Sequence, residues 1–397
     1  MPIDIQVAVI GGGVVGCAVA MEISGHYDNV FLFEKNPGIT QGENQSSRNS
    51  GVIHSGIYYD LETRPNKAAL CVSGNRMLFD FCRRHHVPAL ETGKLIVASH
   101  KEEETLDLYL DRARQNRVPG VEKISGARVR DMEPNVFAES ALLVPSAGIV
   151  DPTSLVYRLH TIALRQGVSF ITGTEVTGLE KKGGLILLHI LYPDGKRDLI
   201  RANAVVNAAG VHADRLARIF NPGSPYEIDP VTGESYKFYL HKRPELGLNG
   251  MNVYPTPETV TTAHGQHFTV GIHLTPTFRD TSFPPKLGST VIIGPRLVPA
   301  KKREERPGPL TPPRIFADKA SLFFPGIKEE DLIWHQAGTQ ARLRDYPDFV
   351  IKADESHPFF INLLGIDSPG LTSCLAIARR VKKMLADLNK ERTPYTC

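Results

Sequence analysis

Two histidines, His54 and His273, have the residue type and setting to take a proton from a bound substrate. Each lies in a glycine-containing segment, where the backbone can pass close to a ligand. Histidine suits proton removal because its unperturbed pKa lies near neutral pH. One chemistry that such a base supports is oxidation of an alcohol, in which the base takes the hydroxyl proton while a hydride leaves the carbon that carries the hydroxyl. A structural histidine bonded to the backbone is the alternative at each position.

A second group of side chains could hold such a substrate. Arginine binds a carboxylate through two parallel hydrogen bonds, and Arg296 and Arg342 are the candidates. Gln340, Tyr58 and Tyr254 could orient the substrate, although the tyrosines could equally belong to an aromatic core. No cysteine or histidine spacing is typical of a metal site, so we expect no metal.

The N-terminal region indicates the electron acceptor. A predicted strand over residues 6–10 runs into a glycine-rich turn, and a helix is expected over residues 17–24. In such a unit the glycines allow a tight turn, close approach of the backbone to a pyrophosphate, and close packing of helix on strand. An acidic residue ending the next strand can accept a hydrogen bond from a ribose hydroxyl. The pattern predicts a dinucleotide site rather than an ordinary glycine-rich turn, and its candidate contacts are Gly11, Gly13, Gly16, Glu34 and Lys35.

Further segments favour FAD over NAD as this dinucleotide. Residues 204–210 and 359–365 each predict an apolar strand that ends in small residues, and a helix is expected from Leu371 onward. A site spread over the whole chain suits a long ligand, whereas NAD enzymes usually keep theirs in one contiguous unit. Cys374 raises the possibility of a covalent flavin, but we expect a small buried residue there and non-covalent FAD. The further candidate contacts are Val176, Ala209, Gly210, Asp367, Ser368, Pro369, Gly370, Leu371 and Thr372.

Composition limits the other classes of function. The chain has 397 residues, 41% of them apolar, and its net charge of +3 is too small to argue for nucleic acid. Five cysteines without paired spacing suggest free thiols in a reducing, cytoplasmic compartment. We expect no transmembrane segment and no N-terminal targeting peptide, and peripheral membrane association stays open.

The order of the motifs predicts an α/β (α+β) fold with two discontinuous domains. A Rossmann-like FAD-binding domain is expected over residues 1–84, 147–224 and 335–397. A mainly antiparallel substrate domain is expected over residues 85–146 and 225–334, the second of which is rich in Pro, Gly, Thr and aromatic residues. A strand is predicted over residues 94–98 and a helix over residues 153–166.

Several segments resemble one family. Residues 46–59, which contain His-Ser-Gly-Ile-Tyr-Tyr, and residues 270–276, which contain Gly-Ile-His-Leu-Thr-Pro, are similar to L-2-hydroxyglutarate dehydrogenases and oxidases of the D-amino-acid-oxidase-like superfamily. Residues 67–74, 93–98, 148–151 and 252–257 also match. The resemblance implies FAD, a two-domain fold and transfer of a hydride from an L-2-hydroxy acid to flavin N5. It also implies that the flavin contacts a loop made of Ser47, Arg48, Asn49, Ser50 and Gly51.

The chain departs from that family at positions that bear on the substrate. Thr277 and Gln340 stand where members carry arginine, and Arg296 follows Gly-Pro where an asparagine is common. Residues 279–287 lengthen a hairpin. These departures leave the identity of the substrate open. The sequence also leaves open the electron acceptor (oxygen, a quinone or a protein), the oligomeric state and which histidine is the base. The leading interpretation is oxidation of a small L-2-hydroxy acid. The alternatives are an amine or amino-acid oxidase on the same fold, and a flavoprotein that binds or senses without turnover.

Overall fold

The computed structural model describes residues 4–42, 44–262, 265–300, 302–303 and 311–392. The chain divides into two compact units: unit 1 comprises residues 1–47, 152–230 and 340–397, and unit 2 comprises residues 48–151 and 231–339. Residues 48–84, which were expected in the FAD-binding domain, group with unit 2. Which segments contact the cofactor stays a prediction.

Unit 1 is built on a sheet whose central strands are parallel. These are β1 (Asp4–Ile10), β2 (Val30–Glu34), β9 (Ser169–Thr172), β12 (Arg197–Asn207) and β21 (His357–Leu364). β1 lies between β12 and β2, β9 follows β2, and β21 pairs with the end of β12. Antiparallel neighbours extend the sheet, namely β10 (Glu175–Lys182), β11 (Leu185–Leu191) and β20 (Val350–Asp354).

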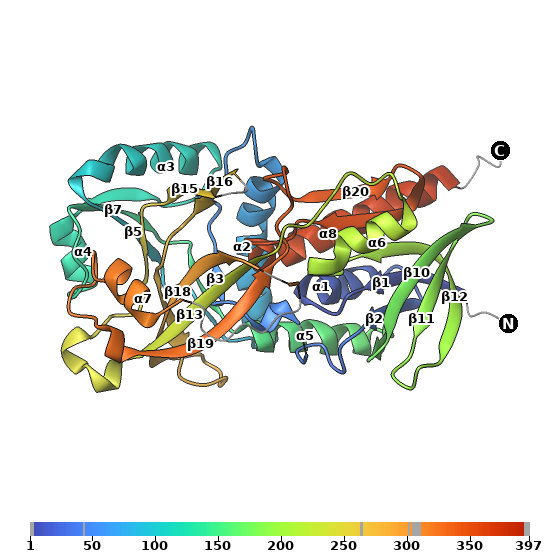
Figure 1. Ribbon diagram of the computed structural model, residues 1–397, viewed down its shortest axis with the longest axis horizontal. Coiled ribbons are helices and arrows are strands. Elements are labelled where there is room, and N and C mark those ends of the chain that lie inside the picture. Colours follow the sequence, from blue (N-terminus) through green and yellow to red (C-terminus); the bar gives the residue numbers. More distant parts are fainter. Residues whose placement is uncertain (1–3, 43, 263–264, 301, 304–310, 393–397) are drawn as a thin grey trace. The chain divides into compact units, whose positions relative to one another are not determined.

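Helices cover this sheet, which explains its continuous apolar runs. Parallel strands are buried on both faces because their crossover helices pack there. α1 (Val14–Ile23) is buried almost all round, since α5 (Pro152–Arg165) and α8 (Gly370–Arg392) both pack against it. Figure 1 shows α1 and α8 side by side. α6 (Ala213–Phe220) contacts β10, β12 and β21.

Unit 2 contains an eight-stranded, mainly antiparallel sheet in the order β19-β13-β18-β17-β14-β5-β7-β6. Within it, β5 and β14 pair in parallel. The strands are β5 (Lys94–Ala98), β6 (Glu122–Ser125), β7 (Ser140–Val144), β13 (Val231–Tyr239), β14 (Asn252–Pro255), β17 (Leu274–Phe278), β18 (Leu287–Pro299) and β19 (Leu332–Gln340). Smaller sheets join β3 (Val52–Ile53), β8 (Gly148–Val150) and β4 (Ala89–Leu90), and β15 (Glu258–Thr262) with β16 (Gly265–Thr269).

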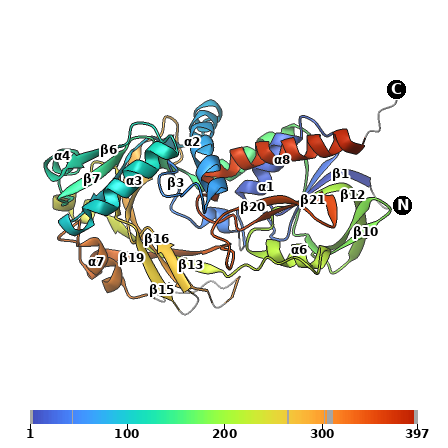
Figure 2. The same cartoon turned by 90° about the horizontal axis from the view of Figure 1, so that it is seen from above.

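The two faces of this large sheet pack against different helices because side chains alternate along each strand. Leu95 and Val97 of β5 point into a core with α4 (Gly126–Met132) and α7 (Pro313–Ala320). Ile96 and Ala98 point to the opposite side, into a cluster with α2 (Pro65–His85) and α3 (Glu103–Gln115). We call this second side the α2–α3 face. Figure 2 shows α3 beside β6 and β7.

The predicted fold class is confirmed, with a parallel, helix-covered sheet in unit 1 and a mainly antiparallel sheet in unit 2. The strand predicted at residues 94–98 is β5, and the helix predicted from Leu371 is α8, which begins at Gly370. The hairpin expected to be lengthened by residues 279–287 is the β17–β18 hairpin, where the Arg279 N–H donates to the Lys286 carbonyl at 2.9 Å.

Candidate functional site

Of the four glycines between β1 and the first turn of α1, Gly11 and Gly16 are required by packing, whereas Gly13 is open. A Cβ on Gly16 would lie 1.9 Å from the carbonyl oxygen of Gly11, and a Cβ on Gly11 would lie 2.4 Å from that of Ala208. Gly11 also has a φ of +109°, which side chains other than glycine rarely adopt. A Cβ on Gly13 would meet within 4 Å only the hydroxyl of Ser46, at 3.1 Å. Backbone at Gly13 is therefore free to be approached by a ligand.

Side chains around this turn hold its shape. The Gly12 N–H donates to Glu34 Oε2 at 2.6 Å, and the Asn36 N–H donates to Glu34 Oε1 at 2.8 Å. The Val14 N–H at the start of α1 donates to Ser46 Oγ at 2.8 Å. Glu34, expected to bind a ribose, is thus fixed at the end of β2 beside the turn. Ser46 was not singled out from the sequence, because a cap contributed from 32 residues away leaves no local pattern.

The carboxyl ends of β1, β12 and β21 meet at one edge of the sheet, which is where open α/β sheets bind ligands. Ala209 and Gly210 follow β12 directly. The buried Asn207 side chain donates to Asn362 Oδ1 on β21 at 2.9 Å and to the Ala213 carbonyl at 2.7 Å, which ties these ends together. The predicted segment from Asp367 to Thr372 joins β21 to α8, at the same edge.

Other predicted residues of unit 1 have protein partners. Arg342 Nε lies 3.8 Å from Asp367 Oδ2, so the arginine expected to hold a substrate carboxylate is next to a carboxylate of its own unit. Lys35 Nζ lies 3.1 Å from His212 Nε2. Val176 is buried in the core beside β10 and β11. The contacts of these residues with a ligand stay predictions.

The residues of this edge fit FAD. The open backbone at Gly13 would receive the pyrophosphate at the start of α1, where the partial positive charge of the helix N-terminus favours a negative group. Glu34 is a carboxylate buried at the end of the second strand, as a ribose-binding acid requires.

In unit 2, the predicted loop from Arg48 to Gly51 lies against β19. The Gln336 side chain donates to the Asn49 carbonyl at 3.2 Å, and the Gly51 N–H donates to Asn49 Oδ1 at 2.9 Å. A Cβ on Gly338 would lie 2.1 Å from the Arg48 carbonyl oxygen, so glycine is required for this approach. Within unit 2, the loop is therefore held against β19 at Gln336 and Gly338.

His273 lies at one end of a buried aromatic cluster on the α2–α3 face. Its ring stacks on Tyr254, with centroids 3.7 Å apart and planes 14° apart. His273 Nδ1 lies 3.0 Å from the Gly271 carbonyl, and that oxygen can only accept, so Nδ1 carries the proton and Nε2 is left with its lone pair. Nε2 is buried and has no partner among the described residues. The pKa of His273 is lowered to about 3, mainly by burial and to a smaller extent by the positive charge of Lys94, although the hydrogen bond to Gly271 acts in the opposite direction.

His54 belongs to the same electrostatic cluster. Burial holds its pKa well below the usual value of 6.5, and Lys94 and His273 act in the same direction. The structure therefore brings both predicted histidines into one environment, and each is uncharged at neutral pH. An uncharged imidazole can accept a proton, which a protonated one cannot.

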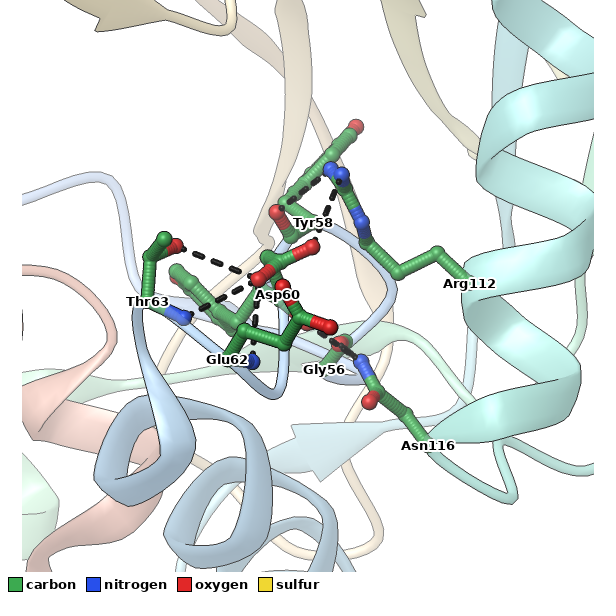
Figure 3. A network of polar contacts seen from close by, with 8 residues as sticks. Gly56, Tyr58, Asp60, Glu62, Thr63, Arg112 and Asn116 are labelled. Atoms are coloured by element: carbon green, nitrogen blue, oxygen red, sulfur yellow. Dashed lines mark hydrogen bonds and ion pairs between the residues drawn. The ribbon is translucent and has the colours of Figure 1, made fainter.

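Figure 3 shows the polar network that holds the loop carrying Tyr58. Asn116, at the end of α3, donates to the carbonyls of Gly56 at 2.9 Å and Tyr59 at 2.7 Å. Arg112 donates to the Tyr58 carbonyl at 3.3 Å and lies 3.5 Å from Asp60 Oδ2. The Tyr58 ring is buried and packs edge-on against Tyr109 at 5.6 Å.

Arg296 and Lys94 have surroundings that the sequence did not predict. Arg296 on β18 is exposed and donates to Thr311 Oγ1 at 2.6 Å, opposite Glu234 in the strand register. Lys94 was predicted only as the start of a strand, yet its side chain is fully buried in the cluster with Tyr58 and Tyr254. The available signal was a lysine at the head of the apolar run Leu-Ile-Val-Ala.

The structure describes four of the five cysteines. Cys17, Cys71, Cys82 and Cys374 are free and buried, and Cys397 lies outside the described residues. Within the residues described, no helix combines the length and apolar character needed to cross a membrane.

Comparison with known proteins gives matches along most of the chain. Residues 6–384 match the family described as "FAD dependent oxidoreductase". The mitochondrial L-2-hydroxyglutarate dehydrogenase of Arabidopsis thaliana is 30% identical over 420 residues, which cover 95% of this chain and 82% of that protein. The glycerol 3-phosphate dehydrogenase of Caloramator mitchellensis is 29% identical over 97% of this chain and 75% of its own length.

Solved structures agree with these matches. The FAD-bound, dithionite-reduced L-alpha-glycerophosphate oxidase of Mycoplasma pneumoniae superposes with a TM-score of 0.82 at 26% identity, covering 96% of this chain and 95% of that one. Glycine oxidase from Geobacillus kaustophilus shares the fold, with a TM-score of 0.76 at 18% identity over 97% and 95% of the two chains. The resemblance seen in the sequence is confirmed, and the chain belongs to the family of FAD-dependent oxidoreductases, with FAD as its cofactor.

Proposed function

We propose that this protein oxidises a small 2-hydroxy acid, or a related alcohol that carries an anionic group. The observation that carries the proposal is the pair of buried, uncharged imidazoles, His54 and His273, in one cluster of unit 2. Removal of a hydroxyl proton needs such a base, whereas oxidation of an amine does not. Relatives named for L-2-hydroxyglutarate and for glycerol 3-phosphate support an alcohol with a distal anionic group.

His273 is the better defined of the two bases. Its Nδ1–H donates to Gly271, which fixes the tautomer, and Tyr254 fixes the plane of the ring. The lone pair on Nε2 is then the position that receives the substrate hydroxyl proton. When bound, FAD supplies the acceptor for the hydride that leaves the same carbon.

The burial of the cluster contributes to this chemistry in two ways. It excludes water, which would otherwise compete for the lone pair on Nε2. It also lowers the pKa of His273, and an anionic substrate nearby would raise that pKa again by stabilising the imidazolium. We therefore expect the imidazole to become a stronger base when an anionic substrate is bound.

The proposal is tested by anaerobic reduction of the flavin. The FAD-loaded enzyme is mixed with L-2-hydroxyglutarate, L-lactate, glycerol 3-phosphate, glycine and L-proline, and bleaching of the flavin absorbance is followed. We expect rapid bleaching by at least one of the three alcohols. Bleaching by the amino acids alone would contradict the proposal.

A second candidate is oxidation of an amine or amino acid. The observation in its favour is the aromatic cluster of Tyr58, Tyr109 and Tyr254, since aromatic walls suit amine substrates. Glycine oxidase also shares the fold. The same panel separates the two candidates.

A further inference from the structure

Lys94 stands on the α2–α3 face of the large sheet of unit 2. It is the first residue of β5, and the preceding Gly93, with a φ of +71°, turns the chain into the strand. Asn252, its partner in the parallel β14 register, donates to the Gly93 carbonyl at 3.0 Å and fixes that turn. Alternation then directs Lys94 to the same side as Ile96, into the tyrosine cluster.

Two tyrosine rings enclose the ammonium group. Lys94 Nζ lies 3.8 Å from the centroid of the Tyr254 ring and 5.0 Å from that of Tyr58. The His273 ring lies 3.7 Å from the same Tyr254 centroid. Two groups this close to one ring cannot share a side of it, so Lys94 and His273 lie on opposite faces of Tyr254. The order is therefore Tyr58, Lys94, Tyr254 and His273.

The cluster supplies no negative charge for Lys94. Its Nζ is fully buried and has no hydrogen-bond or ion-pair partner among the described residues. Burial raises the pKa of Cys71, Tyr58 and Tyr254 and lowers that of the two histidines, so all of these are uncharged at neutral pH. Farther out on α3, Arg112 faces Asp60. The groups that face Lys94 are Cys71 from α2, His54 and Tyr58 from the loop after β3, Tyr254 from β14 and His273 from β17.

A buried ammonium without a counter-ion is unfavourable for folding. Cation–π contacts compensate only in part, because the charge has lost its hydration. Burial accordingly lowers the pKa of Lys94 to about 7, so the protein at neutral pH carries this charge only in part. A group in that state responds strongly to an anion that arrives nearby.

We propose that Lys94 is the buried positive charge that positions an anionic group of the substrate at the cluster, acting through the tyrosine rings. This inference rests on the proposed function, in which the substrate is an anion. A carboxylate and a phosphate share the required chemistry.

The sign of the pH dependence follows from linkage. An anion stabilises the protonated amine, so binding raises the pKa of Lys94 and draws in a proton above pH 7. Anion affinity is therefore highest below pH 7 and falls as the pH rises above it. Between pH 6 and pH 8.5 we expect a fall of about 10-fold, because the charged fraction falls by at least that factor.

The test measures binding of two probes to the FAD-loaded enzyme. Glutarate represents a carboxylate, and sulfate, whose charge is constant over this range, represents a phosphate. Calorimetry at pH 6 and 8.5 compares the wild type with Lys94→Met and with Lys123→Met. Lys123 lies on β6 of the same sheet, where Asp107 pairs with it at 2.9 Å, so its variant makes the same chemical change outside the cluster.

Lys94→Met should bind the preferred probe more weakly at pH 6 and with the same affinity at both pH values. Lys123→Met should behave as the wild type. Wild-type affinity and pH dependence in Lys94→Met would overturn the proposal. If that variant does not load FAD, the wild type is titrated at pH 8 in two buffers of different ionisation enthalpy, which measures the protons taken up when the anion binds. Absence of proton uptake would also overturn the proposal. These are binding measurements, so they stand apart from whether any alcohol reduces the flavin.

Discussion

Substitutions at Gly13 and Gly16 should have different effects, although the two residues are only three positions apart. A substitution at Gly16 should destabilise the fold, and one at Gly13 should weaken FAD binding. At Gly16 a Cβ would lie 1.9 Å from the Gly11 carbonyl oxygen, where ordinary contact begins at 3.4 Å. The obstacle is backbone on both sides, so β1 and α1 would have to move apart. Overpacking of this kind destabilises by about 1 to 3 kcal/mol or more, and we expect Gly16→Ala to fall at the upper end, at about 3 kcal/mol.

At Gly13 the same substitution meets little resistance from the protein. The backbone there has a φ of −71°, which alanine adopts freely, and the nearest neighbour is the Ser46 hydroxyl at 3.1 Å. Loss of glycine at the residue before a helix destabilises by less than about 1 kcal/mol. The new methyl group would instead occupy the space proposed for the pyrophosphate. We expect FAD affinity to fall about 10- to 100-fold for Gly13→Ala, and binding to be lost for Gly13→Val.

Both effects are measured on apoprotein. Urea denaturation followed by circular dichroism gives the free energy of unfolding, and quenching of FAD fluorescence gives the affinity. A Gly13→Ala protein that binds FAD as tightly as the wild type would refute the proposed approach of the cofactor at Gly13. A Gly16→Ala protein as stable as the wild type would refute the packing argument.

Three further outcomes follow from the structure. FAD should be released completely into the supernatant by acid precipitation, because Cys374 is buried with a raised pKa and is not poised to attach it; flavin left on the pellet would contradict this. His273→Ala should slow anaerobic flavin reduction about 100- to 10,000-fold while FAD still binds, and a wild-type rate would remove His273 as the base. Lys94 has a pKa of about 7 in the fold against 10.5 ordinarily, so the unfolded chain binds more protons between those values and stability rises with pH. The wild type should therefore gain stability relative to Lys94→Met between pH 7 and pH 9, by up to about 1.4 kcal/mol of unfolding free energy per pH unit. A difference between the two proteins that stays constant with pH in urea titrations would contradict the buried charge.

The sequence predicted best those elements whose structure depends on neighbouring residues in the chain. The strand, glycine turn and helix at the N-terminus occupy about 20 consecutive residues, and Gly11 and Gly16 are required by the packing of the turn itself. β5 and α5 were also predicted within a residue of their observed ends, because continuous burial and helical periodicity are visible in single segments.

The substrate side was harder to predict because it depends on register between distant strands. Lys94 enters the tyrosine cluster because β5 pairs in parallel with β14, more than 150 residues later in the chain. Arg342 was predicted from its residue type alone, and its proximity to Asp367 depends on how β21 continues into α8. A periodicity within one segment cannot contain such information.

Lys94 also bears on the choice between the two candidate functions. A positive charge sealed behind aromatic rings attracts a carboxylate or a phosphate and repels a protonated amine, and solvent screens this interaction little because Nζ is fully buried. An amino acid brings both charges to the cluster, so attraction and repulsion partly cancel, whereas a hydroxy acid brings only the anion. The two imidazoles add a proton acceptor that an alcohol needs and a neutral amine does not. Charge and proton acceptor therefore favour the same substrate class, an anionic alcohol.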